Sequence, residues 1–195
     1  EMARTLGSYA KLTKPKISEI ALHLFAERGY AAVSMRQIAS KVGLQVGALY
    51  NYFPDKQTIL SELLINHMEN LLQTWHRQKL PEKSDKLLEF FVDFHIEYHI
   101  NRPEEVFIAY MELRNLSPEN FEKIENLRNK YELVLNKILS DGVNKNLFAC
   151  EETKIASLAI IGMLKEVNTW YKKDGKISVP EIKKIYQQIV LKAVT

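Results

Sequence analysis

Residues 34–53 read SMRQIASKVGLQVGALYNYF, and this stretch decides the fold. Ser34 and Gln37 have the spacing of a capping box, in which each side chain accepts a hydrogen bond from the other residue's backbone N–H at a helix start. Apolar residues then recur at helical spacing until Gly43, which readily adopts the left-handed conformation that ends a helix. A second helical run follows almost at once and stops before Pro54. The stretch therefore predicts two short helices joined by a tight turn.

The sequence on both sides of this stretch is punctuated in the same way. Thr13 and Pro15 are typical of a helix start, and Gly29 is typical of a helix end. After Pro54 an apolar stripe continues to about Lys79. Further helix starts are marked near residues 84, 103, 117, 151 and 178, where Ser, Thr, Pro and acidic residues gather. We expect about nine helices, no strand, and so an all-α fold.

The composition supports a helical globular protein. Of the 195 residues, 46% are apolar, which is more than disordered chains contain, and 7 Gly and 6 Pro are too few for a sandwich or barrel with many tight turns. Cys150 is the single cysteine, which excludes an intramolecular disulfide framework and a thiolate-rich zinc site. No apolar run approaches the roughly 20 residues of a membrane span, and the first residues lack the apolar run of a signal peptide. We therefore expect a cytoplasmic protein.

Charge is concentrated at one end of the chain. Residues 1–56 hold eight basic and four acidic residues, a net charge of +4. The remainder holds 19 basic and 20 acidic residues, a net charge of −1. This imbalance indicates that a polyanion meets the N-terminal segment while the rest of the chain serves another purpose.

A helical pair of this kind can bind DNA, because the second helix of a helix-turn-helix enters the major groove with its N-terminus first. Gln45 can bond to adenine N6 and N7, Val46 can contact a thymine methyl group, and Gly47 allows close approach. The other expected contacts are Ser34, Tyr50, Tyr52 and Lys56 with phosphates, and Arg36 and Asn51 with phosphates or bases. From the residues alone, a purely structural helical hairpin is the alternative.

Four runs in the first third of the chain resemble one family. Residues 20–30, 34–39, 42–44 and 47–56 are similar in order and spacing to the TetR family of transcriptional regulators. That family usually has Ser or Thr where this chain has Gln45, which is a poorer helix N-cap. We therefore interpret Gln45 as a residue freed to read a base. The resemblance implies an N-terminal three-helix DNA-binding domain, followed by an all-helical domain that binds a ligand and forms a dimer.

The resemblance also sets the expected domain boundaries and function. We expect a helix-turn-helix domain over residues 13–56, a linking helix from 55 to about 79, and the second domain over 80–195. Residues 112–114, 162–164, 168–171, 174–176 and 178 resemble the subgroup of TetR-type repressors that respond to acyl-CoA thioesters. This implies a repressor of double-stranded operator DNA that an apolar small molecule, such as an acyl-CoA, releases. A helical module that binds a small molecule or a protein, and no DNA, is the alternative, and the salt dependence of DNA affinity separates the two.

Aromatic and Met residues in the second half are sufficient to line an apolar pocket. The expected lining residues are Phe91, Phe94, Tyr98, Phe107, Tyr110, Met111, Tyr131 and Met163. For the acyl-CoA itself, Arg102 and Arg114 are expected to bind the phosphates, Trp170 to stack on adenine, and Asn168 to bond near the thioester. For each of these residues, ordinary packing or a surface position is the alternative.

Two apolar stripes predict a two-fold dimer through the last two helices, because pseudo-palindromic half-sites need two recognition helices. One stripe is Ile155, Leu158, Ala159 and Gly162, and the other is Ile182, Ile185, Tyr186 and Ile189. The stripes could equally face the core of their own chain.

The sequence gives little support for a catalytic, metal-binding or cofactor-binding site. His95 and His99 lie four residues apart, but a third metal ligand is not evident, so we expect no metal. A Gly-x-Ser-x-Gly nucleophile elbow and a Gly-rich phosphate loop are both missing from the sequence. We therefore expect no cofactor and no enzyme activity.

Overall fold

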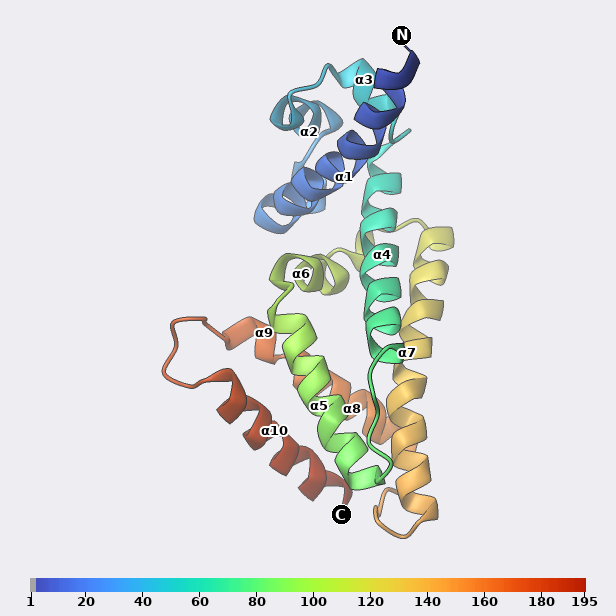
Figure 1. Ribbon diagram of the computed structural model, residues 1–195, viewed down its shortest axis with the longest axis vertical. Coiled ribbons are helices and arrows are strands. Elements are labelled where there is room, and N and C mark those ends of the chain that lie inside the picture. The colour runs from blue at the N-terminus through green and yellow to red at the C-terminus, as the bar shows by residue number, and fades with distance from the viewer. Residues whose placement is uncertain (1–2) are drawn as a thin grey trace. The chain divides into compact units, whose positions relative to one another are not determined.

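The protein is almost entirely helical. The computed structural model describes residues 3–195, with side chains from Thr13 onward, and no strand occurs in this part of the chain. In chain order the elements are α1 (Ala3–Arg28), η1 (a 3₁₀ turn, Tyr30–Ala32), α2 (Met35–Val42), α3 (Val46–Tyr50), α4 (Lys56–His76), α5 (Ser84–Ile100), α6 (Pro103–Met111), η2 (a 3₁₀ turn, Leu113–Asn115), α7 (Pro118–Asn144), α8 (Thr153–Lys165), α9 (Val167–Trp170) and α10 (Val179–Val194) (Figure 1). The predicted all-α class with about nine helices is confirmed, since α9 is a single turn directly after α8.

Contacts divide the chain into two compact units, and the division is not the one expected at residue 80. Unit 1 runs up to Met68 and adds Glu104–Glu125, whereas unit 2 contains Glu69–Pro103 and Asn126–Thr195. The middle segment groups with unit 1 because Ile108 and Ala109 of α6 and Ile124 of α7 belong to its buried core. The domain boundary expected near residue 80 and the assignment of ligand binding to residues 80–195 both stay predictions.

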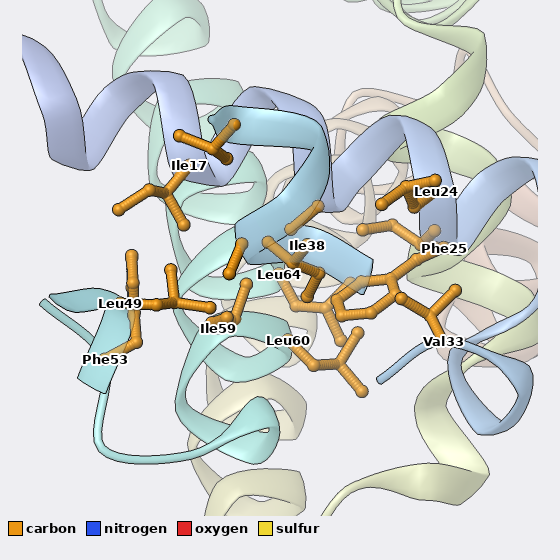
Figure 2. Close-up of a cluster of buried hydrophobic side chains, with 14 of the residues drawn as sticks. Ile17, Leu24, Phe25, Val33, Ile38, Leu49, Phe53, Ile59, Leu60 and Leu64 are labelled. Carbon is orange, nitrogen blue, oxygen red and sulfur yellow. The ribbon is translucent and has the colours of Figure 1, made fainter. Parts of the chain in front are cut away.

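The core of unit 1 holds the helix-turn-helix in place. Its largest buried side chains come from α1, α2, α3, α4 and the segment between α3 and α4, and they point toward one another (Figure 2): Ile17, Leu24, Phe25, Ile38, Leu49, Phe53, Ile59, Leu60 and Leu64. Burying one such side chain contributes about 1.5–3 kcal/mol relative to leaving it in water. This shared core fixes α2 and α3 against α1 and α4.

The ends of α2 follow the sequence signals closely. The Gln37 N–H donates to Ser34 Oγ at 3.2 Å, and the Ser34 N–H donates to Gln37 Oε1 at 2.7 Å, which confirms the capping box. Gly43 has φ +85° and ends α2 in the left-handed conformation. A side chain at Gly43 would be strained in this conformation, which explains why glycine stands there.

The start of α1 differs from the prediction. The helix begins at Ala3 instead of near Thr13, and Pro15 lies inside it. A proline inside a helix removes one hydrogen bond and costs about 3 kcal/mol. Ile17 and Ala21, two and six residues later, are fully buried and help to offset this cost.

Unit 2 is organised around α5, which packs against α8, α9 and α10. Trp75 of α4 contacts three α5 rings, those of Phe90, Phe91 and Phe94, at centroid distances of 5.2–5.9 Å. Within residues 3–195 no helix combines the length and the apolar composition that a bilayer span requires.

Candidate nucleic-acid interface and ligand cavity

The helix α3, expected from the sequence to enter the major groove, begins immediately after Gln45. This residue occupies the N-cap position with extended φ and ψ of −68° and 142°, and its side chain makes no capping hydrogen bond within the described chain. The Gln45 side chain is exposed, whereas Val46 packs partly against the unit 1 core. No described atom lies within 4 Å of the place where a Cβ would stand on Gly47, so this surface is open. Gln45 is thus available to a partner, as the sequence interpretation requires.

The other expected DNA contacts surround α3 but differ in exposure. Ser34, Arg36, Tyr50 and Asn51 are exposed, and Tyr50 shows 49% of its surface to solvent. Tyr52 is half-buried against the unit 1 core. Their roles at DNA stay predictions.

Lys56 has an internal role that the sequence did not indicate. Its ammonium donates to the backbone carbonyls of Tyr30 at 2.7 Å and Val33 at 2.6 Å, and it lies 4.1 Å from the centre of the Tyr30 ring. Burial lowers the pKa of Lys56, against the opposing effect of the Glu112 carboxylate. Two of its three N–H donors are therefore occupied in holding the Tyr30–Val33 turn, which leads directly into α2. The phosphate contact expected of Lys56 stays a prediction beside this internal role.

A cavity of about 430 Å³ lies within unit 2, between the end of α4, α5 and α10. Three of the expected ligand residues line it: Phe94, Tyr98 and Arg102. The Arg102 guanidinium stacks 3.9 Å from the centre of the Tyr98 ring and donates to the Tyr98 carbonyl at 3.1 Å. Phe90, Asp93, Glu97 and Lys183 complete much of the wall.

The charged wall of this cavity is held together across α5 and α10. Lys183 forms an ion pair with Glu97, and Gln187 donates to Asp93 at 2.7 Å. Burial raises the pKa of Asp93, an effect that Gln187 and Lys183 oppose. The cavity thus combines an aromatic side with a rim that carries both signs of charge.

The remaining expected ligand residues do not line this cavity. Phe91 and Tyr131 are buried and stack on each other at 5.5 Å, so they belong to the packed core of unit 2. Phe107, Tyr110, Met111 and Arg114 belong to unit 1, and Phe107, Met111 and Arg114 are exposed there. Met163 and Asn168 are half-buried and Trp170 is exposed, all within unit 2. The ligand set expected from the sequence is therefore divided between the units.

His95 and His99 form a buried stacked pair in unit 2. Their ring centres lie 3.9 Å apart, His95 Nδ1 lies 3.1 Å from the Tyr131 hydroxyl, and His99 Nδ1 lies 2.7 Å from the His95 carbonyl oxygen. Burial lowers the pKa of His99 to about 4. Among the described residues, no group of three or more His, Cys, Asp and Glu side chains is placed to hold a metal ion.

The two predicted apolar stripes mostly face away from the core of unit 2. On α8, Ile155, Leu158, Ala159 and Gly162 are all exposed, Ile155 to 66%. On α10, Ile185 and Ile189 are exposed and Tyr186 is half-buried. Ile182 is the exception, because it is only 2% exposed and packs into the core. The alternative that both stripes face their own core is thereby excluded for most of their residues.

Comparison with known proteins identifies the family. The family profile described as "Bacterial regulatory proteins, tetR family" matches residues 17–63, and the profile described as "Tetracyclin repressor-like, C-terminal domain" matches residues 81–194. The chain belongs to the TetR family. As a TetR-family protein it is a ligand-responsive, DNA-binding transcriptional regulator and not an enzyme.

Relatives match this TetR-family chain over almost its whole length. The HTH-type transcriptional repressor KstR2 of Rhodococcus jostii is 26% identical over 182 residues, which cover 91% of this chain and 89% of the relative. The solved structure of the fatty acid degradation regulator FadR from Bacillus halodurans is 26% identical, with a TM-score of 0.76 and coverage of 92% and 94%. AibR in complex with isovaleryl coenzyme A and operator DNA is 21% identical, covers 91% and 97%, and shares the fold with a TM-score of 0.83.

Two polar residues of this TetR-family chain make structural contacts that the sequence did not predict. Gln57, in the first turn of α4, bonds to the backbone of Asn115 and Ser117. Glu112, noticed only as part of a resemblance, is 5% exposed and accepts the Tyr30 N–H at 3.1 Å. All three contacts join residues more than 55 positions apart, and no local pattern marks such partners.

Proposed function

We propose that this regulator is a repressor that an acyl-CoA, or a similar molecule with an apolar tail and an anionic head, releases from its operator. The observation that carries the proposal is the unit 2 cavity, where Phe90 and Phe94 offer apolar surface and the Arg102 guanidinium offers positive charge, while Lys183 is paired with Glu97. The AibR complex with isovaleryl coenzyme A supports the ligand class. We also propose a cytoplasmic location, because bacterial operator DNA lies there.

The energy available from an acyl tail is sufficient for this control. Each buried methylene contributes on the order of 0.8 kcal/mol, so a tail of about ten carbons retains several kcal/mol after ordering costs. Allosteric coupling between two sites typically requires about 1–3 kcal/mol. Only the part of the binding energy that distinguishes the DNA-binding arrangement from the released one acts on the operator.

The effector proposal is tested by calorimetric titration with acyl-CoA, free fatty acid and CoA. We expect an acyl-CoA to bind tighter than about 100 μM, roughly 5.5 kcal/mol, and to lower operator affinity. The variant Arg102→Met should weaken acyl-CoA binding about tenfold, because it removes a charge-assisted phosphate contact. Arg77→Met, at an exposed position just after α4, is the matched control and should bind as the wild type does. Binding of none of the three compounds below about 100 μM contradicts the effector, but leaves DNA binding intact.

For the DNA contacts, we propose that Gln45, Val46 and Gly47 meet base edges while Ser34, Arg36, Tyr50, Asn51 and Tyr52 meet the backbone or neighbouring bases. The exposed, uncapped position of Gln45 supports its part in this assignment.

Gln45→Ala is expected to change which operator bases are preferred, because a base contact carries sequence information and a phosphate contact does not. Selection of operators from a random pool measures this preference. Tyr50→Phe is the comparison, and should weaken binding to all sequences without changing their ranking. An unchanged preference in the Gln45 variant removes Gln45 from base readout. A DNA affinity that does not depend on salt would instead favour a module that does not bind DNA.

We propose that the protein is a homodimer through the exposed faces of α8 and α10. Apolar surface of this extent, with small residues at 159 and 162 that allow close helix approach, suits a four-helix interface between two copies. The proposed set omits Ile182, which packs in the core.

The double variant Leu158→Glu with Ile185→Glu is expected to sediment as a monomer at micromolar concentration, where the wild type sediments as a dimer. The variant places two carboxylates in each half of an apolar interface, where no partner compensates the cost of removing their charges from water. Leu147→Glu, at an exposed leucine between α7 and α8, is the control and should stay dimeric. A monomeric wild type would remove the dimer from the proposal.

A further inference from the structure

The chain passes between unit 1 and unit 2 at three places, and two of them lie inside continuous helices. The crossings are within α4 after Met68, at the start of α6 after Pro103, and within α7 after Glu125. Because α4 and α7 are unbroken, a displacement of either helix in unit 2 moves its N-terminal end in unit 1 as well.

Gln57 joins these two N-terminal ends. Its Nε2 donates to the Asn115 carbonyl at 2.8 Å, and its Oε1 accepts the Ser117 N–H at 3.0 Å. Gln57 lies in the first turn of α4, and Ser117 directly precedes α7. One amide side chain therefore satisfies both a donor and an acceptor of the backbone that leads from η2 into α7. This pair of bonds links the first turn of α4 to the residues just before α7.

Glu112 connects the same backbone to the helix-turn-helix. One carboxylate oxygen accepts the Tyr30 N–H at 3.1 Å, and the other accepts Asn115 Nδ2 at 2.5 Å. Tyr30 opens the turn that leads into α2, and Lys56, the neighbour of Gln57, holds the carbonyls of that turn. A carboxylate that is 5% exposed is costly unless it is bonded. The hydrogen bonds from the Tyr30 N–H and from Asn115 Nδ2 compensate the cost of burying the Glu112 carboxylate between η2 and the Tyr30–Val33 turn.

We propose that Glu112 and Gln57 form a latch through which the state of unit 2 controls the position of the recognition helix. With the latch closed, the Tyr30–Val33 turn is fixed and α2 and α3 are held for DNA. A shift of α4 relative to α7 breaks the Gln57 bonds, moves η2, and withdraws Glu112 from the Tyr30 N–H. Glu112 and Gln57 are positioning residues, since they act on DNA through the helix-turn-helix. The release of the latch by a ligand rests on the effector function proposed above.

The first test compares operator affinity with and without decanoyl-CoA for the wild type, Gln57→Ala, Glu112→Ala and Glu112→Gln. Without ligand, the two Ala variants should bind the operator about tenfold more weakly than the wild type. Decanoyl-CoA should then lower their residual affinity less than twofold, whereas typical coupling in a wild-type protein is about 5- to 150-fold. Glu112→Gln keeps an oxygen that accepts the Tyr30 N–H and should retain most of the response. A purely structural role predicts weaker binding with the same fold release as the wild type, and that result overturns the latch.

The second test needs no effector. Hydrogen exchange of the full chain should become about tenfold faster over residues 30–52 in Gln57→Ala and Glu112→Ala, and stay unchanged in α5 and α10. Glu119→Ala, at an exposed acidic residue in the first turn of α7, is the matched control and should exchange as the wild type does. If decanoyl-CoA fails to release the wild type, the proposed effector is wrong and this test decides the latch. Unchanged exchange over residues 30–52 overturns it.

Discussion

Lys56→Met is expected to lower the free energy of unfolding by about 2–3 kcal/mol, because hydrogen bonds to charged groups contribute about 1.5–3 kcal/mol and this ammonium makes two of them. Both bonds go to carbonyls of the Tyr30–Val33 turn, which would lose their partners. Methionine keeps the length and the apolar stem of lysine, so the loss reports on the charge. Operator affinity should fall at least tenfold, since the same turn positions α2. Urea unfolding and operator titration measure the two effects.

A matched variant distinguishes the internal role of Lys56, which we call the Lys56 clamp on the Tyr30–Val33 turn, from a phosphate contact. Lys16→Met lies on an exposed part of α1 and should change the unfolding free energy by less than about 0.5 kcal/mol. If Lys56→Met unfolds at the wild-type urea concentration but loses operator affinity, then Lys56 acts at DNA directly. The clamp would in that case contribute nothing measurable to stability.

Acidification from pH 7 to pH 4 is expected to remove roughly 3 kcal/mol of stability from unit 2 through His99, at about 1.4 kcal/mol for each pH unit between the two pKa values. Burial holds the pKa of His99 at about 4 in the folded protein, against an ordinary value of 6.5. Above pH 6.5 the imidazole is neutral in both states, and stability is complete. Between 6.5 and 4 only the unfolded chain takes up the proton, so unfolding becomes easier as the pH falls. Below about 4 this loss is complete.

The pH dependence has a direct control. His99→Phe keeps a flat ring in the stack but cannot be protonated, so its denaturant midpoint should change much less between pH 7 and 4. His76→Phe changes an exposed histidine at the end of α4 and should keep the wild-type slope. Asp93 acts in the opposite direction, since burial raises its pKa and its protonation in the folded state favours stability at low pH. A wild-type slope in His99→Phe contradicts the assignment to His99.

Local signals predicted local structure well. The capping box of Ser34 with Gln37 is present, and the helix start predicted near residue 178 has a capping box of Ser178 with Glu181, because each signal depends on residues three positions apart. The left-handed Gly43 is likewise a property of one residue. The start of α1 was misplaced because Pro15 marks a helix start in isolation, whereas the packed residues after it stabilise a helix that passes through it.

Features that depend on distant partners could not be predicted. The sequence around Lys56 is equally compatible with a phosphate contact and with hydrogen bonds to carbonyls 23 and 26 residues away. The packing of α6 into the core of α1 and α4 was not predicted, because apolar periodicity does not say which core a helix joins. The same limit applies to Ile182, whose place in its stripe gave no indication that it faces inward.

The exposed side chain of Gln45 has a consequence for how such a regulator changes over generations. Since it neither caps α3 nor packs in the core, a substitution there leaves folding almost untouched. In many proteins a new specificity must be accompanied by compensating changes elsewhere, because the residue that recognises the partner also stabilises the fold. With the proposed base contact of Gln45, the two roles are separate at position 45. Duplicated copies of this gene could therefore acquire different operators through single mutations, each copy remaining stable at every step.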